Sequence, residues 1–318
     1  MERTGGRHVR FALGVALLAL LSVQCGGNSD ESVDEDGPAT AEPQTGAAST
    51  VDGPKRVVSF SPNITETLFA LGQGGRVVGV TAFCYYPSEA ARLEKVGGYL
   101  NPDLEKVTML SPDLIVLLGR HDKVAEYGEK SGTPVLHVDM NSLATIDGGI
   151  RQLGEAMACG TEADALRGSI RDFLDGVRRA VEGRPRPKVL IVTTRQSHDL
   201  NSLYTVGGES FVSEVVEIAG GVNIYADADQ AYLEASKETV VLRAPEVILE
   251  FHAGESLSPE ERAQYVADWD RLSSLPAVAA GRVHLVTESY ALLAGPRVTL
   301  TAHIIASLLH PEVEIPEP

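Results

Sequence analysis

One stretch of this chain occurs twice, and the repetition limits the folds that the sequence can adopt. The first copy runs from 104 to 116 and the second from 237 to 249. In each copy a Glu opens a short helical pattern, a Pro follows seven positions later, and an acidic residue then precedes an apolar run typical of a buried parallel strand. We interpret the unit as helix, turn and strand, and the chain as two similar α/β lobes.

The segments around the two copies repeat in the same order. The apolar run 56–60 corresponds to 188–192, and the helical pattern 65–72 corresponds to 213–220. Strands that alternate with helices indicate mainly parallel sheets, in which the ligand-facing loops follow the C-terminal ends of the strands. The strands expected in the first lobe are 56–60, 76–80, 113–118 and 134–138.

Local signals define several element ends. We expect Asn63 to be an N-cap, with Glu66 closing a capping box, and Asn101-Pro102 to cap the helix that carries Glu105. In the second lobe we expect a strand over 188–193 and then a loop over 194–204.

The lobes are separated by a long amphipathic segment. From 161 to 183, apolar residues recur with helical spacing, and the opposite face carries mostly Arg. Two prolines within 184–187 would stop this helix. We therefore predict a first lobe over 55–160, one connecting helix over 161–184 and a second lobe over 185–318. A helix is a stiff connector, so limited lobe movement is expected.

The N-terminus has the features of an export signal. Arginines precede an apolar run over 11–21, which is too short to span a membrane. Cys25 ends this segment as in a bacterial lipobox, although Ser22 and Gln24 depart from the usual residues. We predict a lipoprotein signal peptide over 1–25 with lipidation at Cys25, and an ordinary secretory signal is the alternative.

A polar, acidic segment follows the signal. Residues 26–54 are rich in Gly, Ser, Thr, Asp, Glu, Ala and Pro and contain few large aliphatic residues. Such a segment cannot bury enough apolar area to offset the entropy lost on ordering. We predict a disordered tether between a lipid anchor and the folded lobes.

Composition and motifs exclude several classes of function. The net charge is −17 and no basic cluster lies beyond the first ten residues, so nucleic acid is not an expected partner. The chain has no Gly-x-Ser-x-Gly, His-Glu-x-x-His, Gly-x-Gly-x-x-Gly or phosphate-loop motif, so we expect no enzyme. Cys84 and Cys159 are too few for a disulfide framework, and the sequence does not decide whether they pair.

Several short motifs, spread over 55–310, resemble one known family. They are Arg56-Val57-Val58-Ser59 with Ser61-Pro62, Tyr86-Pro87, Val96-Gly97-Gly98-Tyr99, Pro112-Asp113-Leu114-Ile115 and the connecting helix. These segments resemble the helical-backbone (cluster A-II, class III) periplasmic substrate-binding proteins of ABC importers for vitamin B12 and iron chelates. Within the family, the resemblance is greatest to cobalamin-binding members.

The resemblance implies a ligand held between the lobes by aromatic side chains. The corresponding positions are Phe83, Tyr99, Tyr204 and Tyr232. Cobalamin-binding members have Asp and Arg where this chain has Ser289 and Leu293, and haem-binding relatives use a Tyr near the position of Tyr99. A corrinoid is therefore the first expectation, with a ferric siderophore or haem as the alternative. The ligand is cargo, and no cofactor is expected.

The resemblance further implies that one Glu on each lobe contacts Arg residues of a membrane permease. The corresponding residues are Glu105 and Glu238, the pair that opens both copies of the repeat. Acidic residues in a first helical turn also complement the helix dipole, which is the alternative explanation. The expected protein is a monomer, exported to the periplasm or cell surface, and the ATPase subunits act through the permease.

Three further residues are candidate ligand contacts. His121 and His252 follow corresponding strands, and neutral imidazoles there could ligate iron or cobalt. Arg297 could bind propionate, amide or phosphate groups. The alternative for each histidine is a solvated or hydrogen-bonded loop residue. A free Zn or Mn receptor and a metal-dependent hydrolase using His121-Asp122 or His198-Asp199 are the less favoured functions.

Overall fold

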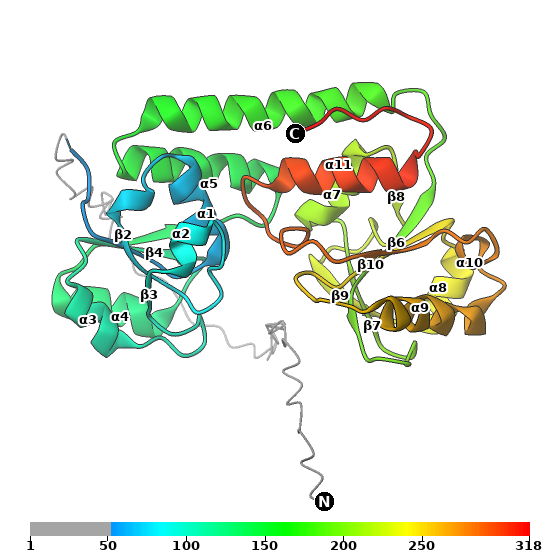
Figure 1. The fold of residues 1–318 in the computed structure, drawn as a ribbon, viewed down its shortest axis with the longest axis horizontal. Coiled ribbons are helices and arrows are strands. Elements are labelled where there is room, and N and C mark those ends of the chain that lie inside the picture. The colour runs from blue at the N-terminus through cyan, green and yellow to red at the C-terminus, as the bar shows by residue number, and fades with distance from the viewer. Residues whose placement is uncertain (1–51) are drawn as a thin grey trace, which may run out of the picture. The chain divides into compact units, whose positions relative to one another are not determined.

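The computed structural model describes residues 52–318, and these residues belong to one compact unit (Figure 1). The predicted signal peptide over 1–25, the lipidation of Cys25 and nearly all of the tether over 26–54 lie outside the described residues. The predicted α/β class with two mainly parallel sheets is confirmed. The lobe boundaries stay a prediction.

The first lobe is built on a parallel sheet with the strand order β3-β2-β1-β4-β5. Its strands are β1 (Val57–Ser59), β2 (Val77–Val80), β3 (Glu94–Lys95), β4 (Leu114–Leu118) and β5 (Val135–Val138). Its helices are α1 (Pro62–Ala70), η1 (Gly74–Arg76), α2 (Ser88–Ala91), α3 (Leu104–Leu110), α4 (Asp122–Ser131) and α5 (Leu143–Ala156). The four predicted strands are present, and the two-residue β3 is an addition at the sheet edge.

Two predicted helix caps were wrong. Helix α1 starts at Pro62 with Ser61 as the N-cap residue, since Pro is favoured at the first helical position. Asn63 therefore lies inside the helix, and its side chain reaches the carbonyl of Ala294 in the second lobe at 2.9 Å. Glu66 makes no capping box, because its carboxylate binds Arg297. Helix α3 is capped by the Asp103 side chain, which accepts from Lys106 N.

The second lobe contains a mixed sheet with the order β11-β10-β6-β7-β9, and β8 also pairs with β6. Its strands are β6 (Lys188–Arg195), β7 (Leu203–Val206), β8 (Val222–Asn223), β9 (Tyr232–Ala235), β10 (Val247–Phe251) and β11 (Val283–Val286). Its helices are α7 (Phe211–Ile218), α8 (Lys237–Arg243), α9 (Pro259–Asp268), η2 (Trp269–Leu272), α10 (Pro276–Ala279) and α11 (Val298–Leu309). Ser258 and Glu261 form a capping box at the start of α9.

The loop predicted over 194–204 was wrong at both ends. Strand β6 continues to Arg195, and β7 returns antiparallel to it from Leu203. Strand β9 then pairs antiparallel with β7. The β7 segment is short and carries the polar residues Tyr204 and Thr205, so it lacks the continuous apolar run that marks a central parallel strand.

The internal repeat is also a repeat of structure. Helices α3 and α8 both end at a residue in the left-handed region, Ser111 with φ 44° and Ala244 with φ 48°. After the Pro of each copy, the acidic side chain accepts a hydrogen bond from a backbone N–H at the start of β1 or β6. The carboxylate of Asp113 accepts from Arg56 N, and that of Glu246 accepts from Lys188 N, both at 2.8 Å.

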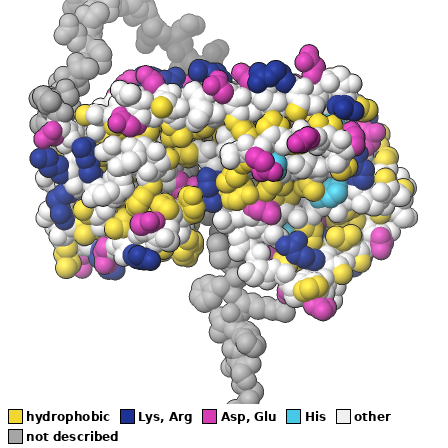
Figure 2. Space-filling view, turned by 45° about the horizontal axis from the view of Figure 1, so that its top comes forward, with side chains coloured by type: hydrophobic (Ala, Val, Ile, Leu, Met, Phe, Trp, Pro, Cys, Tyr) yellow, Lys and Arg dark blue, Asp and Glu magenta, His cyan; other side chains and the backbone are white. Residues whose placement is uncertain are grey.

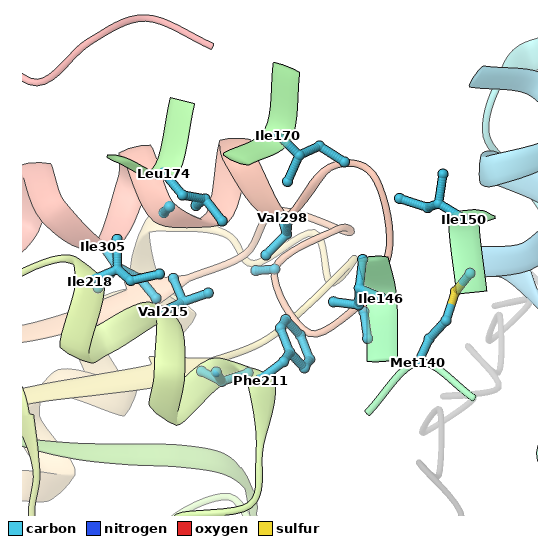
Figure 3. Packing of buried hydrophobic residues seen from close by; sticks show 14 of the residues in the cluster. Met140, Ile146, Ile150, Ile170, Leu174, Phe211, Val215, Ile218, Val298 and Ile305 are labelled. Carbon is cyan, nitrogen blue, oxygen red and sulfur yellow. The ribbon is translucent and has the colours of Figure 1, made fainter. Parts of the chain in front are cut away.

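Helix α6 (Gly160–Ala180) connects the two sheets and packs against helices of both lobes (Figure 1). It contacts α5 of the first lobe and both α7 and α11 of the second. Figure 3 shows Ile170 and Leu174 pointing from α6 toward Val298 and Ile305 of α11. These side chains belong to one hydrophobic cluster that includes strands of both sheets. This shared core is consistent with the prediction of limited lobe movement.

The two internal cysteines are not paired. Cys84 and Cys159 are both buried and free. The Cys84 sulfur lies 3.2 Å from the hydroxyl of Thr65 and 3.1 Å from that of Thr81, so it is held within the first lobe. Cys159 is the N-cap residue of α6, where burial and the nearby Glu162 raise the pKa of its thiol.

Candidate ligand cleft and docking helices

A small pocket lies where residues of the two lobes meet. Its volume is about 140 Å³. From the first lobe it is lined by Ser61, Asn63, Leu118, Met140 and Asn141, and from the second by Phe211, Ala231, Tyr232, Leu292, Leu293 and Ala294. Leu118 ends β4 and Met140 follows β5, as expected for a site at the C-terminal ends of parallel strands. The volume of this pocket is far smaller than that of a tetrapyrrole. A ligand of that size would therefore extend beyond the pocket onto the surfaces around it.

In the first lobe, the structure brings Phe83, Tyr99 and His121 together. The Phe83 side chain is 51% exposed and lies beside Gly98, where an added Cβ would be 3.3 Å from its ring. The rings of Tyr99 and His121 meet edge to face at 4.9 Å. The hydroxyl of Tyr99 donates to the carbonyl of Arg120 at 2.6 Å. Desolvation and the negative charge of Asp122 raise the pKa of Tyr99.

His121 has a structural role at the start of α4. Its Nδ1 accepts from Val124 N, which makes it the N-cap side chain, so the proton of the neutral ring lies on Nε2. That nitrogen donates to the carbonyl of Tyr99 at 2.5 Å. Both ring nitrogens are therefore occupied, and His121 orients the Tyr99 loop and has no nitrogen free for a metal.

In the second lobe, Tyr204 and Tyr232 lie on the β7–β9 ladder. Tyr204 pairs with Glu234 and Val206 with Tyr232, so both tyrosines share one face as diagonal neighbours. The Tyr232 side chain is 42% exposed and lines the pocket between the lobes. Desolvation raises the pKa of Tyr232, and a hydrogen bond with Ser210 counters part of the increase.

His252 lies in a buried polar network in which carboxylates contact both of its ring nitrogens. Its Nε2 is 3.0 Å from Glu250 Oε1 and its Nδ1 is 3.1 Å from Glu255 Oε2. Burial alone would lower the pKa of His252, but the two carboxylates outweigh burial and raise it. Two acceptor-only partners favour the imidazolium form, which cannot ligate a metal.

Glu250 is the centre of this network, and the sequence reasoning missed it. Its buried carboxylate also accepts from Arg195 Nε and Trp269 Nε1, both at 2.8 Å. Arg195 in turn binds Asp268, which contacts His198 at 3.1 Å. The sequence did contain a sign of this network, since Glu250 is an acidic residue inside the apolar run 247–251. A carboxylate buried in such a strand needs hydrogen-bond partners.

Arg297 joins the two lobes. Its guanidinium binds both carboxylate oxygens of Glu66, with Nε donating to Oε2 at 2.7 Å. The same group lies over the ring of Tyr86 at 4.1 Å and over that of Tyr290 at 5.0 Å. Burial raises the pKa of Glu66, although Arg297 opposes the increase. Through these contacts Arg297 links the two lobes. The sequence suggested a ligand contact for Arg297 and gave no sign of this link.

Glu105 and Glu238 occupy the same place in the two lobes. Each is the second residue of its helix, α3 or α8, and each side chain is exposed. Neither carboxylate belongs to an ion pair within residues 52–318. Lys106 of α3 pairs with Glu94 at 2.7 Å and Arg243 of α8 pairs with Asp227 at 2.6 Å. Hydrogen bonds from the backbone of Glu238 and the side chain of Ser236 lower the pKa of Glu238, and the charge of the adjacent Lys237 adds to this effect. Lys237 itself belongs to no ion pair within residues 52–318.

Residues 52–318 contain neither a metal-binding cluster nor a membrane-spanning helix. No group of three or more His, Cys, Asp or Glu side chains there is arranged to hold a metal ion. In the same range, no helix combines the length and apolar character needed to cross a membrane.

Comparison with known proteins gives matches over most of the chain. Residues 57–290 match the family model described as periplasmic binding protein. The chain is 27% identical over 258 residues to the vitamin B12-binding protein of Pectobacterium carotovorum, covering 80% of this chain and 88% of that protein. It is 28% identical over 264 residues to an uncharacterized ABC transporter substrate-binding lipoprotein of Bacillus subtilis, covering 81% of each.

Solved structures share the fold. The periplasmic heme-binding protein of Roseiflexus superimposes with a TM-score of 0.68 at 24% identity, covering 81% of this chain and 99% of that one.

Proposed function

We propose, because this chain belongs to the periplasmic binding protein family, that it captures a corrinoid between its two lobes and delivers it to the permease of an ABC importer. The family consists of binding proteins, so the protein is not an enzyme. Binding energy selects the cargo and concentrates it at the membrane, and ATP is hydrolysed on other subunits.

The observation that carries the proposal is an exposed aromatic side chain on each lobe, one of which, Tyr232, lines the pocket. Phe83 is 51% exposed and Tyr232 is 42% exposed, one on each lobe. Large apolar side chains are usually buried, and exposed groups of them mark binding sites. Tyr99 is partly buried and follows Gly98, which lies beside Phe83; Tyr204 is partly buried and is the diagonal neighbour of Tyr232 on the β7–β9 ladder.

The available energy suits a large flat ligand. Four rings that together lose about 400 Å² of apolar surface would contribute about 10 kcal/mol before association costs, at about 25 cal/mol per Å². The relatives support a tetrapyrrole-like cargo, since one is a vitamin B12-binding protein. Haem is the second candidate, because a Tyr phenol is a known type of iron ligand; to bind iron, the hydroxyl of Tyr99 would have to leave the carbonyl of Arg120.

The lipid anchor belongs to the same proposal. A Cys25 acylated at the end of the signal would hold the lobes at the membrane through the tether, near the permease. The similarity to a substrate-binding lipoprotein supports this arrangement. Mass spectrometry of the mature chain would detect diacylated Cys25, and an unmodified N-terminus elsewhere would refute it.

Isothermal titration of residues 54–318 with cyanocobalamin, haemin and a ferric hydroxamate tests the cargo. Saturable one-to-one binding of cyanocobalamin, tighter than that of the other two, is the expected result. Binding of an iron chelate alone would keep the importer role and refute the corrinoid. No binding of any of the three would refute the chelate class.

A matched pair of substitutions tests the site itself. Phe83→Ala should weaken binding of the cargo by about tenfold or more, because a stacked ring is lost. Tyr85→Ala removes a ring of similar exposure, 68%, from the same loop and should change affinity by less than about twofold. Equal losses for both variants would refute the specific assignment of Phe83.

A further inference from the structure

The two helices of the repeat share a second surface feature. Met109 on α3 is 82% exposed and Leu242 on α8 is 83% exposed, and no other large hydrophobic side chain within residues 52–318 is as exposed. Each residue lies four positions after the Glu of its helix, on the same helical face. Opposite this face, Val107 and Val240 are fully buried, so both helices present the same side to solvent.

The match is selective within the two helices. Between the seven residues of α3 and those of α8, only the Glu and the buried Val are identical. Positions 106, 108 and 110 of α3 differ in chemistry from 239, 241 and 243 of α8. The exposed position nevertheless carries a large apolar side chain in both. One exposed Met or Leu needs no explanation, but two at equivalent positions of separate lobes form a matched pair of surface patches.

Charge complements the apolar side chains at both patches. Glu105 and Glu238 form no ion pair within the described part of the chain, and Lys106 and Arg243 of the same helices are paired with other acids. Lys237 stands beside Glu238 but makes no ion pair with it, and both carboxylates stay exposed to a partner. On the face shown in Figure 2, Lys and Arg are interspersed with Asp and Glu. At each patch, an exposed carboxylate and an exposed apolar side chain lie on the same face of one helix.

We propose that Met109 and Leu242 are apolar anchors for the permease of the importer, each entering a pocket beside the basic group that binds Glu105 or Glu238. Two equivalent patches fit a partner that presents two copies of one surface, as a dimeric permease does. This inference rests on the proposed function and adds the groups that would supply most of the binding energy. Interfaces commonly combine a desolvated apolar centre with a polar rim.

Binding of the full chain to its own permease–ATPase complex in lipid nanodiscs tests the proposal. Met109→Ala and Leu242→Ala should each weaken binding by about tenfold, and the double variant by about a hundredfold, because the two patches contact separate permease copies. Affinity for cyanocobalamin and the unfolding temperature should not change, since neither side chain is buried. Val266→Ala, at a 38% exposed apolar residue on α9, is the matched control and should bind normally.

The possible failures are distinguishable. If the double variant binds within twofold of the unchanged chain while Glu105→Lys/Glu238→Lys abolishes binding, the apolar anchors are wrong and the docking role stands. If the charge-reversed variant also binds normally, the docking surface and the importer role assigned to it are both refuted. If the unchanged chain dimerises in sedimentation and Met109→Ala/Leu242→Ala makes it monomeric, the patches serve a second copy of the chain, which overturns the proposal.

Discussion

Replacing Arg297 by Met should destabilise the protein strongly at pH 8 and much less at pH 5. The substitution keeps an apolar stem of similar length between Tyr86 and Tyr290 but removes both hydrogen bonds to Glu66. The Glu66 side chain is only 4% exposed, so its carboxylate would be left without a partner in a desolvated place. An uncompensated buried charge is the main cost of breaking such a pair.

The expected loss follows from the burial of the pair. Removing one partner of a buried ion pair costs about 3–5 kcal/mol. Burial already raises the pKa of Glu66 with Arg297 present, and the pKa should rise further once the guanidinium is gone. A carboxyl group whose folded-state pKa is raised becomes neutral as the pH falls, so the penalty is relieved in acid and fully present in base.

Urea unfolding and thermal unfolding, each at pH 8 and pH 5, measure both effects. At pH 8, a loss of about 3 kcal/mol corresponds to a decrease in unfolding temperature of about 6–12 °C. The double variant Glu66→Gln/Arg297→Met has no buried charge and should be more stable than Arg297→Met at pH 8. Arg178→Met, which breaks an exposed pair with Asp175, is the control and should cost less than about 1 kcal/mol. An Arg297→Met loss that is the same at both pH values would refute the reasoning.

Three further outcomes are expected. Glu105→Lys/Glu238→Lys should abolish uptake of cargo by whole cells without changing cargo affinity in titration; lost affinity would contradict the docking assignment. Because the pKa of His252 is raised above its usual value of 6.5, its contribution to stability should be complete below pH 6.5 and disappear as the pH rises through the folded-state pKa; a pH profile unchanged by His252→Gln would contradict this. Replacing His121 by Ala should leave the visible spectrum of the bound chelate unaltered, and a shifted metal band would contradict the capping role.

Periodicity and repetition were sufficient for the architecture of the first lobe. The four strands predicted there are all present, because the apolar runs that mark them depend only on neighbours in the sequence. The repeat singled out Glu105 and Glu238 as equivalent positions, and both side chains are exposed in the structure. Their docking role came from the resemblance and stays a prediction.

Contacts between segments distant in the sequence determined the partners of the buried polar residues and the pairing of β6 with β7. The sequence placed His252 on a loop after a strand, but only the fold shows that Glu250 and Glu255 occupy both of its nitrogens. Similarly, Arg297 is 231 positions from Glu66, and no local pattern links the two. The hairpin of β6 and β7 also depends on a partner strand. Helix caps and periodic faces are local properties of the chain, whereas the partners of buried charged groups are set by the tertiary packing that removes them from water.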